Sequence, residues 1–174
     1  KISVPIIGII KNDLKESKVR ITPLLKDVDK VIKSGADIIA FDATKRKRPF
    51  STKEIISKIK KANRLAMADC SNLDDAKNAI LEGVDIIGTT LAGYVGKQAK
   101  DTDEPDFKLV KQFRKLNCFV MAEGRYNSPK LAKKAMLAGA DAVTVGSAIT
   151  RIDNITSWFV TVSYTHLTLP TILL

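Results

Sequence analysis

The stretch Ala138-Gly139-Ala140-Asp141-Ala142 decides the fold, because near copies of it occur twice earlier, as Ser34-Gly35-Ala36-Asp37-Ile38 and Glu82-Gly83-Val84-Asp85-Ile86. In each copy an amphipathic stretch runs into a glycine, the residue favoured at the left-handed position after a helix. A strand-like apolar run follows at once. Each copy predicts a helix end, a tight turn and a strand start, and their recurrence indicates repeated βα units.

Six short apolar runs alternate with helical patterns along the chain. The runs are continuously apolar, as expected for parallel strands that are buried on both faces. Serine or threonine followed by proline, or serine alone, marks helix starts at Thr22-Pro23, Ser51 and Ser128-Pro129. The predicted strands are Pro5–Ile10, Asp37–Phe41, Leu65–Ala68, Asp85–Gly88, Phe119–Ala122 and Ala142–Val145. The predicted helices are residues 23–34, 52–62, 73–82, 106–116, 128–138 and 154–162.

This alternation allows either a (β/α) barrel or a doubly wound parallel sheet. No Gly-x-Gly-x-x-Gly motif follows the first strand, which disfavours a dinucleotide-binding fold. A closed barrel needs eight βα units and ~200–250 residues. The predicted fold class is therefore α/β, a TIM (β/α)8 barrel truncated to about six βα units. We expect the chain as written to be an incomplete barrel with open strand edges, and not an active monomer.

Composition excludes several partners. The chain has 29 Lys and Arg residues against 19 Asp and Glu residues, a net charge of +10. Most of the basic residues are lysines on predicted helix faces, and the few aromatic residues are not interleaved with them, so a stacking platform for single-stranded nucleic acid is missing. A solvated lysine surface, with no nucleic-acid partner, is the favoured interpretation. No apolar run reaches the ~18–20 residues that span a bilayer, so we expect no membrane partner.

The two cysteines, Cys70 and Cys118, supply no disulfide or zinc framework. Both lie in or beside strand-like runs. We therefore expect two buried, reduced thiols in a cytoplasmic protein, and no metal.

Polar residues follow every predicted strand, at the barrel edge where catalytic groups stand. A single polar residue at a strand end has a structural explanation, and Asp42 or Asp69 alone could be structural. The combination of a lysine and a glutamate with the others favours an active site. The residues are Lys11, Asp42 with Thr44, Asp69, Thr89-Thr90, Glu123 and Gly146-Ser147.

A second signal is the run from Val145 to Arg151, where a strand enters a Gly-Ser turn and then a short helical turn at Ala148–Thr150. Phosphate sites of barrels are often built from the last strand loops and the start of a short extra helix. Backbone N–H groups of Gly124 and of residues 146–148 could hold a phosphate, with Arg151 adding a charge-assisted contact.

Taken together, seven stretches resemble the bacterial-type N-acetylmannosamine-6-phosphate 2-epimerases, which are ribulose-phosphate-binding-like barrels. The resemblance runs in order from about residue 4 to about residue 160. It implies interconversion of N-acetylmannosamine 6-phosphate and N-acetylglucosamine 6-phosphate in sialic acid breakdown, without redox cofactor or metal. The stretches are Pro5–Lys11, Ile21–Pro23, Ala40–Thr44, Met67–Asp69, Ile87–Tyr94, Ala122–Arg125 and Val145–Arg151.

By position, the resemblance implies that Lys11 and Glu123 are catalytic. It also implies that Asp69 orients the sugar. The remaining substrate-binding residues, several of them at the phosphate, are Gly124, Arg125, Gly146, Ser147 and Arg151. Family members carry two further βα units upstream, which supply an active-site arginine, and they usually have glycine in place of Ser147. Serine there is costly if the turn needs a positive φ.

The chemistry suits a lysine and a carboxylic acid. Inverting a carbon next to a carbonyl requires removal of its proton and return of a proton to the other face, and two acid/base groups suffice. Three alternatives stay open. Lys11 and Glu123 could form a structural ion pair, the chain could be another barrel acting on an indole or pentose phosphate, or it could be inactive.

The end of the chain departs from the family pattern. We expect a partial (β/α) barrel at residues 1–162, and a non-family tail at residues 163–174 that resembles translated adapter sequence. The tail holds the only histidine, His166, to which we assign no role. For the full-length form we expect a small-molecule sugar phosphate as substrate and a homodimer.

Overall fold

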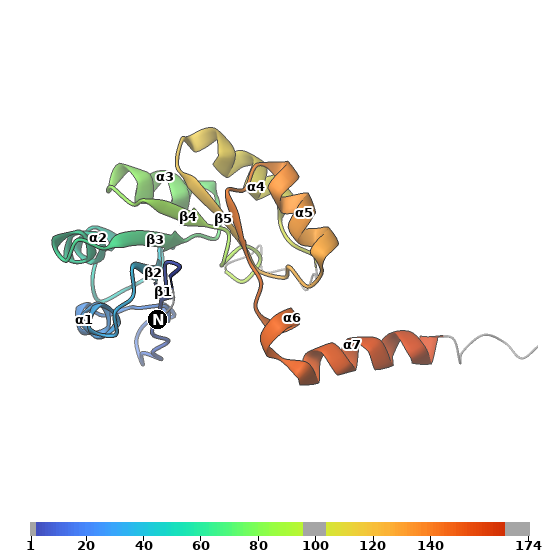
Figure 1. Cartoon of the computed structure of the whole chain (residues 1–174). Coiled ribbons are helices and arrows are strands. Elements are labelled where there is room, and N and C mark those ends of the chain that lie inside the picture. The colour runs from blue at the N-terminus through green and yellow to red at the C-terminus, as the bar shows by residue number, and fades with distance from the viewer. Residues whose placement is uncertain (1–2, 96–103, 166–174) are drawn as a thin grey trace, which may run out of the picture.

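The computed structural model of the chain describes residues 3–95 and 104–165 (Figure 1). Within them, six parallel strands form one sheet in the order β1-β2-β3-β4-β5-β6, the order of the sequence. The strands are β1 (Ile7–Gly8), β2 (Ile38–Asp42), β3 (Leu65–Asp69), β4 (Ile86–Gly88), β5 (Phe119–Glu123) and β6 (Ala142–Thr144). Sequential parallel neighbours are what repeated βα units produce.

Helices connect the strands and cover one face of the curved sheet (Figure 1). Two C-terminal helices, α6 and α7, instead extend away from the sheet. The helices are α1 (Leu25–Lys33), α2 (Thr52–Lys61), α3 (Leu73–Leu81), α4 (Phe107–Phe113) with the 3₁₀ turn η2 (Arg114–Leu116), α5 (Pro129–Ala138), α6 (Ser147–Thr150) and α7 (Ile152–Thr165). None of those in the described ranges is long and apolar enough to cross a membrane.

The predicted helix signals are mostly confirmed. Ser51 forms a capping box with Glu54 at the start of α2, and the Ser128 side chain accepts a hydrogen bond from the Leu131 N–H at the start of α5. Gly35, Gly83 and Gly139 have φ angles of +86°, +92° and +107°, so each occupies the left-handed position that ends a helix.

Two predictions near the N-terminus are wrong for one reason. The strand expected at Pro5–Ile10 is only Ile7–Gly8, and Thr22 does not cap α1, whose N-cap is Leu24. The segment around Thr22 instead folds back onto the chain after β1, and the Thr22 N–H donates to the Ile10 carbonyl at 2.7 Å. The buried Thr22 hydroxyl donates to the Ala40 carbonyl of β2, also at 2.7 Å. These antiparallel contacts replace the continuation of β1.

The repeated turns lock the strands in register. In all three repeats, the aspartate side chain accepts the backbone N–H of a residue on the preceding strand or just before it, and its own N–H donates to that residue's carbonyl. Asp141 accepts from Val120 at 2.8 Å, for example. Each aspartate is also paired with a basic side chain. The pairs, which we call the aspartate clamps, are Asp37 with Arg64, Asp85 with Lys60 and Asp141 with Arg114.

Both faces of the sheet are covered with apolar side chains, but unequally. The larger core lies between sheet and helices, with Phe41, Ile55 and Phe113 fully buried. The inner face carries a smaller cluster made of Ile38, Ala40, Met67, Ile86 and Met121. Of the cysteines, Cys70 is buried as expected, whereas Cys118 is only partly buried, and the prediction of a second buried thiol is wrong.

Candidate active site

Side chains alternate between the two faces of a strand, so a set of polar residues two positions apart from the inner cluster points toward the same inner face. Ala40, Met67 and Met121 belong to the inner cluster. Two residues further along each strand stand Asp42, Asp69 and Glu123, which therefore point to the same side. The inner face thus changes from apolar to polar toward the C-terminal ends of the strands, where barrel active sites lie.

Asp69 is buried, with 2% of its surface exposed. The Thr90 hydroxyl donates to its Oδ1 atom at 2.7 Å. Burial raises the pKa of Asp69 well above its usual value, and the negative charge of Glu123 raises it further, against the Thr90 hydrogen bond. A carboxyl in this position holds a proton more tightly than an exposed aspartic acid does.

Gly88 creates the space for this hydrogen bond. A Cβ atom at position 88 would come within 2.9 Å of the Met67 side chain and 3.0 Å of the Thr90 hydroxyl. It would also lie 3.4 Å from the Asp69 carboxylate. A side chain at position 88 would crowd the Thr90 hydroxyl, so the glycine at the end of β4 leaves room for its hydrogen bond with Asp69.

Glu123 is held by its backbone from the neighbouring strand. The Thr89 hydroxyl donates to the Glu123 carbonyl at 2.9 Å and accepts its N–H at 3.0 Å. The Glu123 side chain is partly buried, and burial raises its pKa. Hydrogen bonding with Thr90 and Thr144 and the charge of Lys11 act in the opposite direction.

Lys11 lies shortly after β1, where its backbone pairs with Ile21. Its positive charge acts on both carboxyls, Asp69 and Glu123. Although all three residues lie in the described part of the chain, Lys11 forms no contact ion pair with Glu123 there. Within the described residues, the structure therefore does not contain the structural ion pair between Lys11 and Glu123 that was considered as an alternative.

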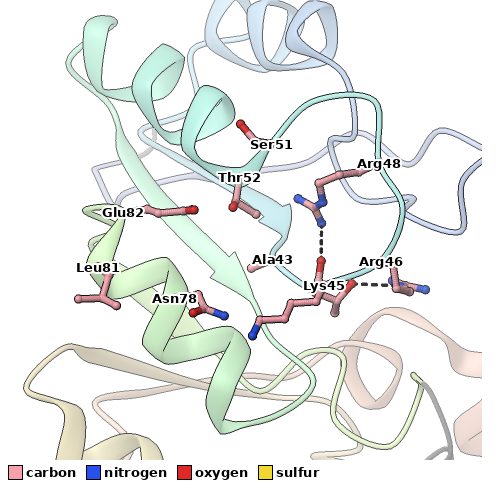
Figure 2. Close-up of a pocket in the computed structure, with 10 residues that line it drawn as sticks. Ala43, Lys45, Arg46, Arg48, Ser51, Thr52, Asn78, Leu81 and Glu82 are labelled. Carbon is pink, nitrogen blue, oxygen red and sulfur yellow. Dashed lines mark hydrogen bonds between the residues drawn. The ribbon is translucent and has the colours of Figure 1, made fainter.

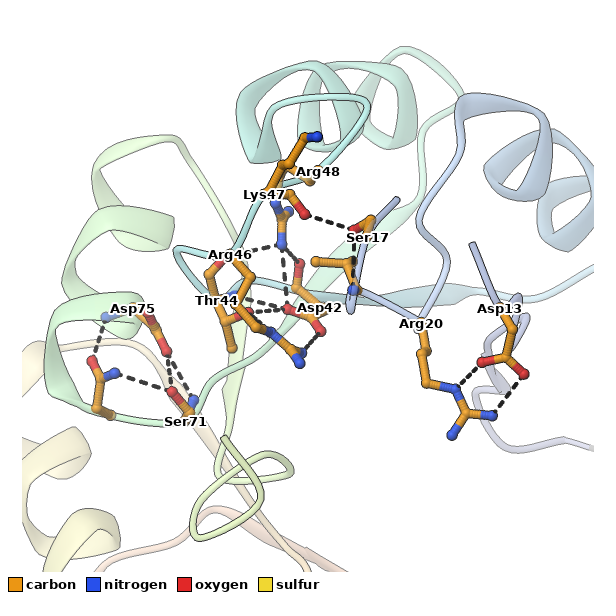
Figure 3. A network of polar contacts seen from close by, with 12 residues as sticks. Asp13, Ser17, Arg20, Asp42, Thr44, Arg46, Lys47, Arg48, Ser71 and Asp75 are labelled. Atoms are coloured by element: carbon orange, nitrogen blue, oxygen red, sulfur yellow. Dashed lines mark hydrogen bonds and ion pairs between the residues drawn. The ribbon is translucent and has the colours of Figure 1, made fainter. Parts of the chain in front are cut away.

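Asp42 stands beside Asp69 in the sheet register but has a different environment. Its carboxylate is paired with the guanidinium groups of Arg46 and Arg48, and the Thr44 hydroxyl donates to it at 2.6 Å (Figure 3). Arg48 also donates to the Asp42 and Thr44 carbonyls. This buried aspartate anchors the loop between β2 and α2, so its role is structural.

Gly124 and Arg125 form a tight turn after β5, with φ angles of +101° and +64°. The Arg125 guanidinium donates to the Ala92 carbonyl at 3.0 Å and lies 4.1 Å from the centre of the Tyr94 ring. Arg125 therefore joins the loops after β4 and β5. Its predicted contact with substrate would come in addition to these contacts.

The predicted phosphate residues lie at the end of β6. Gly146 is the N-cap of α6 and has a negative φ of −101°, and Ser147 is the first helical residue. Serine is therefore not strained at this position. The Arg151 guanidinium donates to the Asp153 carboxylate at 2.6 Å, and both side chains are more than half exposed. The structure thus groups Lys11, Asp69 and Glu123 but leaves Arg151 on a local partner.

A separate cavity of about 630 Å³ lies between the β2–α2 loop and α3 (Figure 2). Its wall includes Lys45, Arg46 and Arg48 from the loop, Asn78 from α3 and Glu82 directly after α3. Of the polar strand-end residues predicted from the sequence, Thr44 alone lines it in the described part of the chain. Nor does any group of three or more His, Cys, Asp or Glu in the described ranges have an arrangement that could hold a metal.

Sequence reasoning named Thr90 only as a strand-end residue and gave it no role in the site, and it did not name Thr144. Both approach Glu123 from neighbouring strands. The available signal was the pair of threonines directly after Gly88, since a glycine at a strand end often permits a close contact. The partners of Arg46 and Arg48 had no such signal, because a basic loop residue is usually solvated.

Comparison with known proteins points in the same direction. Residues 1–164 match the family described as "Putative N-acetylmannosamine-6-phosphate epimerase". A Haemophilus influenzae protein of the corresponding 2-epimerase name is 52% identical over 158 residues, 91% of this chain and 68% of that protein. One from Vibrio vulnificus is 57% identical over 157 residues, covering 90% and 69%.

The solved structure of the N-acetylmannosamine-6-phosphate 2-epimerase from Clostridium perfringens gives a TM-score of 0.88 at 41% identity. The match covers 91% of this chain and 70% of that chain. A structure of FabK from Thermotoga maritima, with a TM-score of 0.54 and 17% identity, shares the fold alone. The predicted fold class, six units of a (β/α) barrel, and the resemblance between the sequences are confirmed.

Proposed function

Since the chain belongs to the N-acetylmannosamine-6-phosphate epimerase family, we propose that it interconverts N-acetylmannosamine 6-phosphate and N-acetylglucosamine 6-phosphate. The observation that carries the proposal is the grouping of Lys11, Asp69 and Glu123 at the polar end of the inner face. These three residues match family positions by sequence, and strands far apart in the chain bring them together.

The reaction inverts carbon 2 of the sugar. This carbon is acidic only when carbon 1 is an aldehyde, so the enzyme acts on the open-chain form. Lys11 and Glu123 are the proposed acid and base, one for each face of carbon 2. The raised pKa of Glu123 suits this role, because a carboxyl that keeps its proton closer to neutral pH can both donate and accept one.

Asp69 is proposed to orient the sugar, and its burial and its hydrogen bond with Thr90 hold its side chain in place. At the other end of the substrate, the backbone of Gly124, Gly146 and Ser147 and the side chains of Arg125 and Arg151 are proposed to bind the remaining polar groups and the phosphate. For this, Arg151 exchanges Asp153 for the phosphate. That exchange costs little, since exposed ion pairs contribute weakly to stability.

The proposal extends to the setting of the enzyme. The catalytic region comprises residues 1–162, without the tail at residues 163–174, whose His166 lies outside the described residues. No redox cofactor is required for a proton transfer. The enzyme is proposed to act in the cytoplasm, where Cys70 and Cys118 remain free thiols, and its full-length form is proposed to be a homodimer.

The test is incubation of the full-length form of the protein with N-acetylmannosamine 6-phosphate in D₂O, followed by NMR of the sugar. We expect N-acetylglucosamine 6-phosphate that carries deuterium at carbon 2. Glu123→Gln should lose this exchange, whereas Glu82→Gln, directly after α3 and away from the proposed site, should keep it. Conversion with full retention of the original proton would contradict the mechanism, and absence of conversion by the full-length form would contradict the proposed function.

A further inference from the structure

The cavity between the β2–α2 loop and α3 is bordered mainly by positively charged groups (Figure 2). Lys45, Arg46 and Arg48 line it from the loop. Thr52 also lines it and is the first residue of α2, a helix of ten residues, so the positive end of a helix dipole borders the same space. Among the lining residues in the described part of the chain, the acidic one is Glu82. The cavity therefore attracts an anion.

Arg48 supplies buried hydrogen-bond donors at this cavity. Its side chain is only 11% exposed, and its Nη2 atom donates to the carbonyls of Asp42 and Thr44 at 2.6 and 3.0 Å. The other terminal nitrogen, Nη1, is buried and has no hydrogen-bond partner within residues 3–95 and 104–165. A guanidinium keeps its charge in proteins and cannot accept a hydrogen bond, so these N–H groups need an acceptor.

Glu82 supplies the complementary acceptor. Its Oε2 atom is buried and likewise has no hydrogen-bond partner among the described residues. Burial lowers the pKa of Arg48, and the negative charges of Asp42 and Glu82 act in the opposite direction, so Arg48 and Glu82 lie close enough to influence each other. In Figure 2 the Glu82 carboxyl points toward Thr52, across the cavity from its own helix. One wall thus lacks an acceptor and the other lacks a donor.

These two requirements select the chemistry of a ligand. A simple anion would satisfy Arg48 but would be repelled by Glu82. A molecule that joins an anionic group to hydroxyl groups satisfies both, because a hydroxyl can donate to a carboxylate. The volume of about 630 Å³ lies in the range of small-molecule sites and far exceeds the ~30 Å³ share of one water molecule.

We propose that this cavity is a second ligand site, separate from the proposed active site, which binds a phosphorylated sugar or polyol. The phosphate lies against Lys45, the Arg48 Nη1 atom and the start of α2, where charge-assisted hydrogen bonds are available. A hydroxyl of the same molecule donates to the Glu82 Oε2 atom. The side-chain amide of Asn78, toward which the Lys45 amine points in Figure 2, offers a donor and an acceptor to further hydroxyls.

The walls of this site all come from residues 43–82, around the neighbouring strands β2 and β3. The site is therefore formed within the chain described, and it does not depend on the proposed epimerase function. None of Lys11, Asp69 and Glu123 lines the cavity in the structure. Occupation of the cavity and occupation of the active site can accordingly be measured independently.

The experiment is a ¹H–¹⁵N NMR titration of the full-length form with glucose 6-phosphate, inorganic phosphate and glucose, each added separately. We expect glucose 6-phosphate to shift the backbone signal of Thr52 and the side-chain amide signal of Asn78 in a saturable way. Inorganic phosphate should bind there about tenfold more weakly, because it leaves Glu82 without a sugar hydroxyl. Glucose alone should give no saturable shift. Binding at the proposed active site is read separately, from the backbone signals of Gly146 and Ser147.

Two variants assign the contacts. Lys45→Ala should weaken glucose 6-phosphate binding at the cavity about tenfold, since a charge-assisted contact is lost. Lys47→Ala is the matched control, because Lys47 carries the same charge on the same loop but pairs with Glu16 and does not line the cavity. It should leave the affinity unchanged. Glu82→Leu should reduce the preference for glucose 6-phosphate over inorganic phosphate about tenfold, because it removes both the acceptor and the repulsion.

Three outcomes would overturn the proposal. The first is the absence of saturable shifts at Thr52 and Asn78 with glucose 6-phosphate, a measurement that needs no variant to fold. The second is equal affinity for inorganic phosphate, which would show an adventitious ion only. The third is equal weakening by Lys45→Ala and Lys47→Ala, which would indicate attraction by surface charge alone. Epimerisation by a protein that binds nothing in the cavity would refute this site and leave the proposed function intact.

Discussion

The two ends of the same strands treat their carboxyl groups in opposite ways. At the N-terminal end, the aspartate clamps give each carboxylate a backbone N–H and a basic partner, as Asp141 has Val120 and Arg114. At the C-terminal end, Asp69 accepts a hydrogen bond from the Thr90 hydroxyl, Lys11 acts on Asp69 and Glu123 at longer range, and burial raises the pKa of both carboxyls. The clamp aspartates have hydrogen-bond and ion-pair partners, whereas Asp69 and Glu123 have no contact cation within the described part of the chain.

The difference separates stability from reactivity within one sheet. A carboxylate that accepts a backbone N–H and pairs with a basic side chain stabilises the strand that it binds. A desolvated carboxyl without a contact cation costs stability and gains reactivity. Asp42 shows that position alone does not decide which type results. It stands at the reactive end, but two arginines make it a structural residue.

The largest expected effect on activity comes from replacing the proposed acid and base at the C-terminal ends of the strands. Glu123→Gln and Lys11→Ala should each lower kcat by about 10²–10⁴-fold, the usual contribution of general acid–base catalysis. Deuterium exchange at carbon 2 measures the loss, and circular dichroism should show an unchanged fold. Near-normal turnover in Glu123→Gln would show that this residue is not part of the mechanism. It would also contradict a catalytic role for the carboxyl groups at the C-terminal ends of the strands.

A smaller effect on activity is expected at the end of β6. Arg151→Ala should raise KM by about tenfold or more, and should lower kcat less, because a charge-assisted contact with the phosphate is made equally in ground and transition states. Affinity for non-phosphorylated N-acetylmannosamine should not change. Equal losses of affinity for both sugars would show that Arg151 does not bind the phosphate.

At the N-terminal ends of the strands, removing an aspartate clamp should lower the free energy of unfolding and leave catalysis unchanged. Asp141→Ala leaves the Val120 N–H without its acceptor and should cost about 2 kcal/mol. For a chain of this size, this corresponds to a fall in Tm of about 4–8 °C. Asp13→Ala, which removes an exposed pair with Arg20, is the control and should leave Tm unchanged. A comparable loss in the control would mean that the clamps contribute no more than surface ion pairs.

The smallest effect is the pH dependence of stability caused by Asp69. Because its pKa is higher in the folded chain than its usual 3.8, the unfolded chain releases this proton first as pH rises. Asp69 therefore costs no stability below the usual value, and an increasing amount as pH rises toward the raised pKa. Asp69→Asn should remove this fall, so the difference in Tm between variant and wild type should grow with pH. A constant difference would contradict the raised pKa.

Local signals predicted much of this architecture. The positions of α2 and α5 follow from Ser51 and Ser128, and the helix ends follow from the repeated glycines, because caps act within a few residues. The fold-back at Thr22 could not be predicted from neighbours in sequence, since its partners are backbone groups of Ile10 and Ala40.

The same limit applies to the site. The rule that barrel catalysis takes place at strand ends was sufficient to list Lys11, Asp69 and Glu123. Which threonine reaches which carboxyl depends on the side-by-side order of β3, β4 and β5, and this order appears only when the sheet is assembled. The pairing of Arg151 with Asp153 likewise reflects how α7 starts, which no strand-end rule addresses.

The aspartate clamps also bear on how the chain reaches its fold. Their aspartates accept backbone N–H groups that lie only 31, 19 and 21 residues earlier in the sequence, so each of these hydrogen bonds joins one strand region to the next. Short separations of this kind favour fast folding, because little loop entropy is lost before contacts form. During synthesis, which delivers the N-terminal part first, strand pairing can proceed progressively from β1 toward β6. The hydrogen bonds at these turns therefore favour pairing of the strands in the order of the sequence.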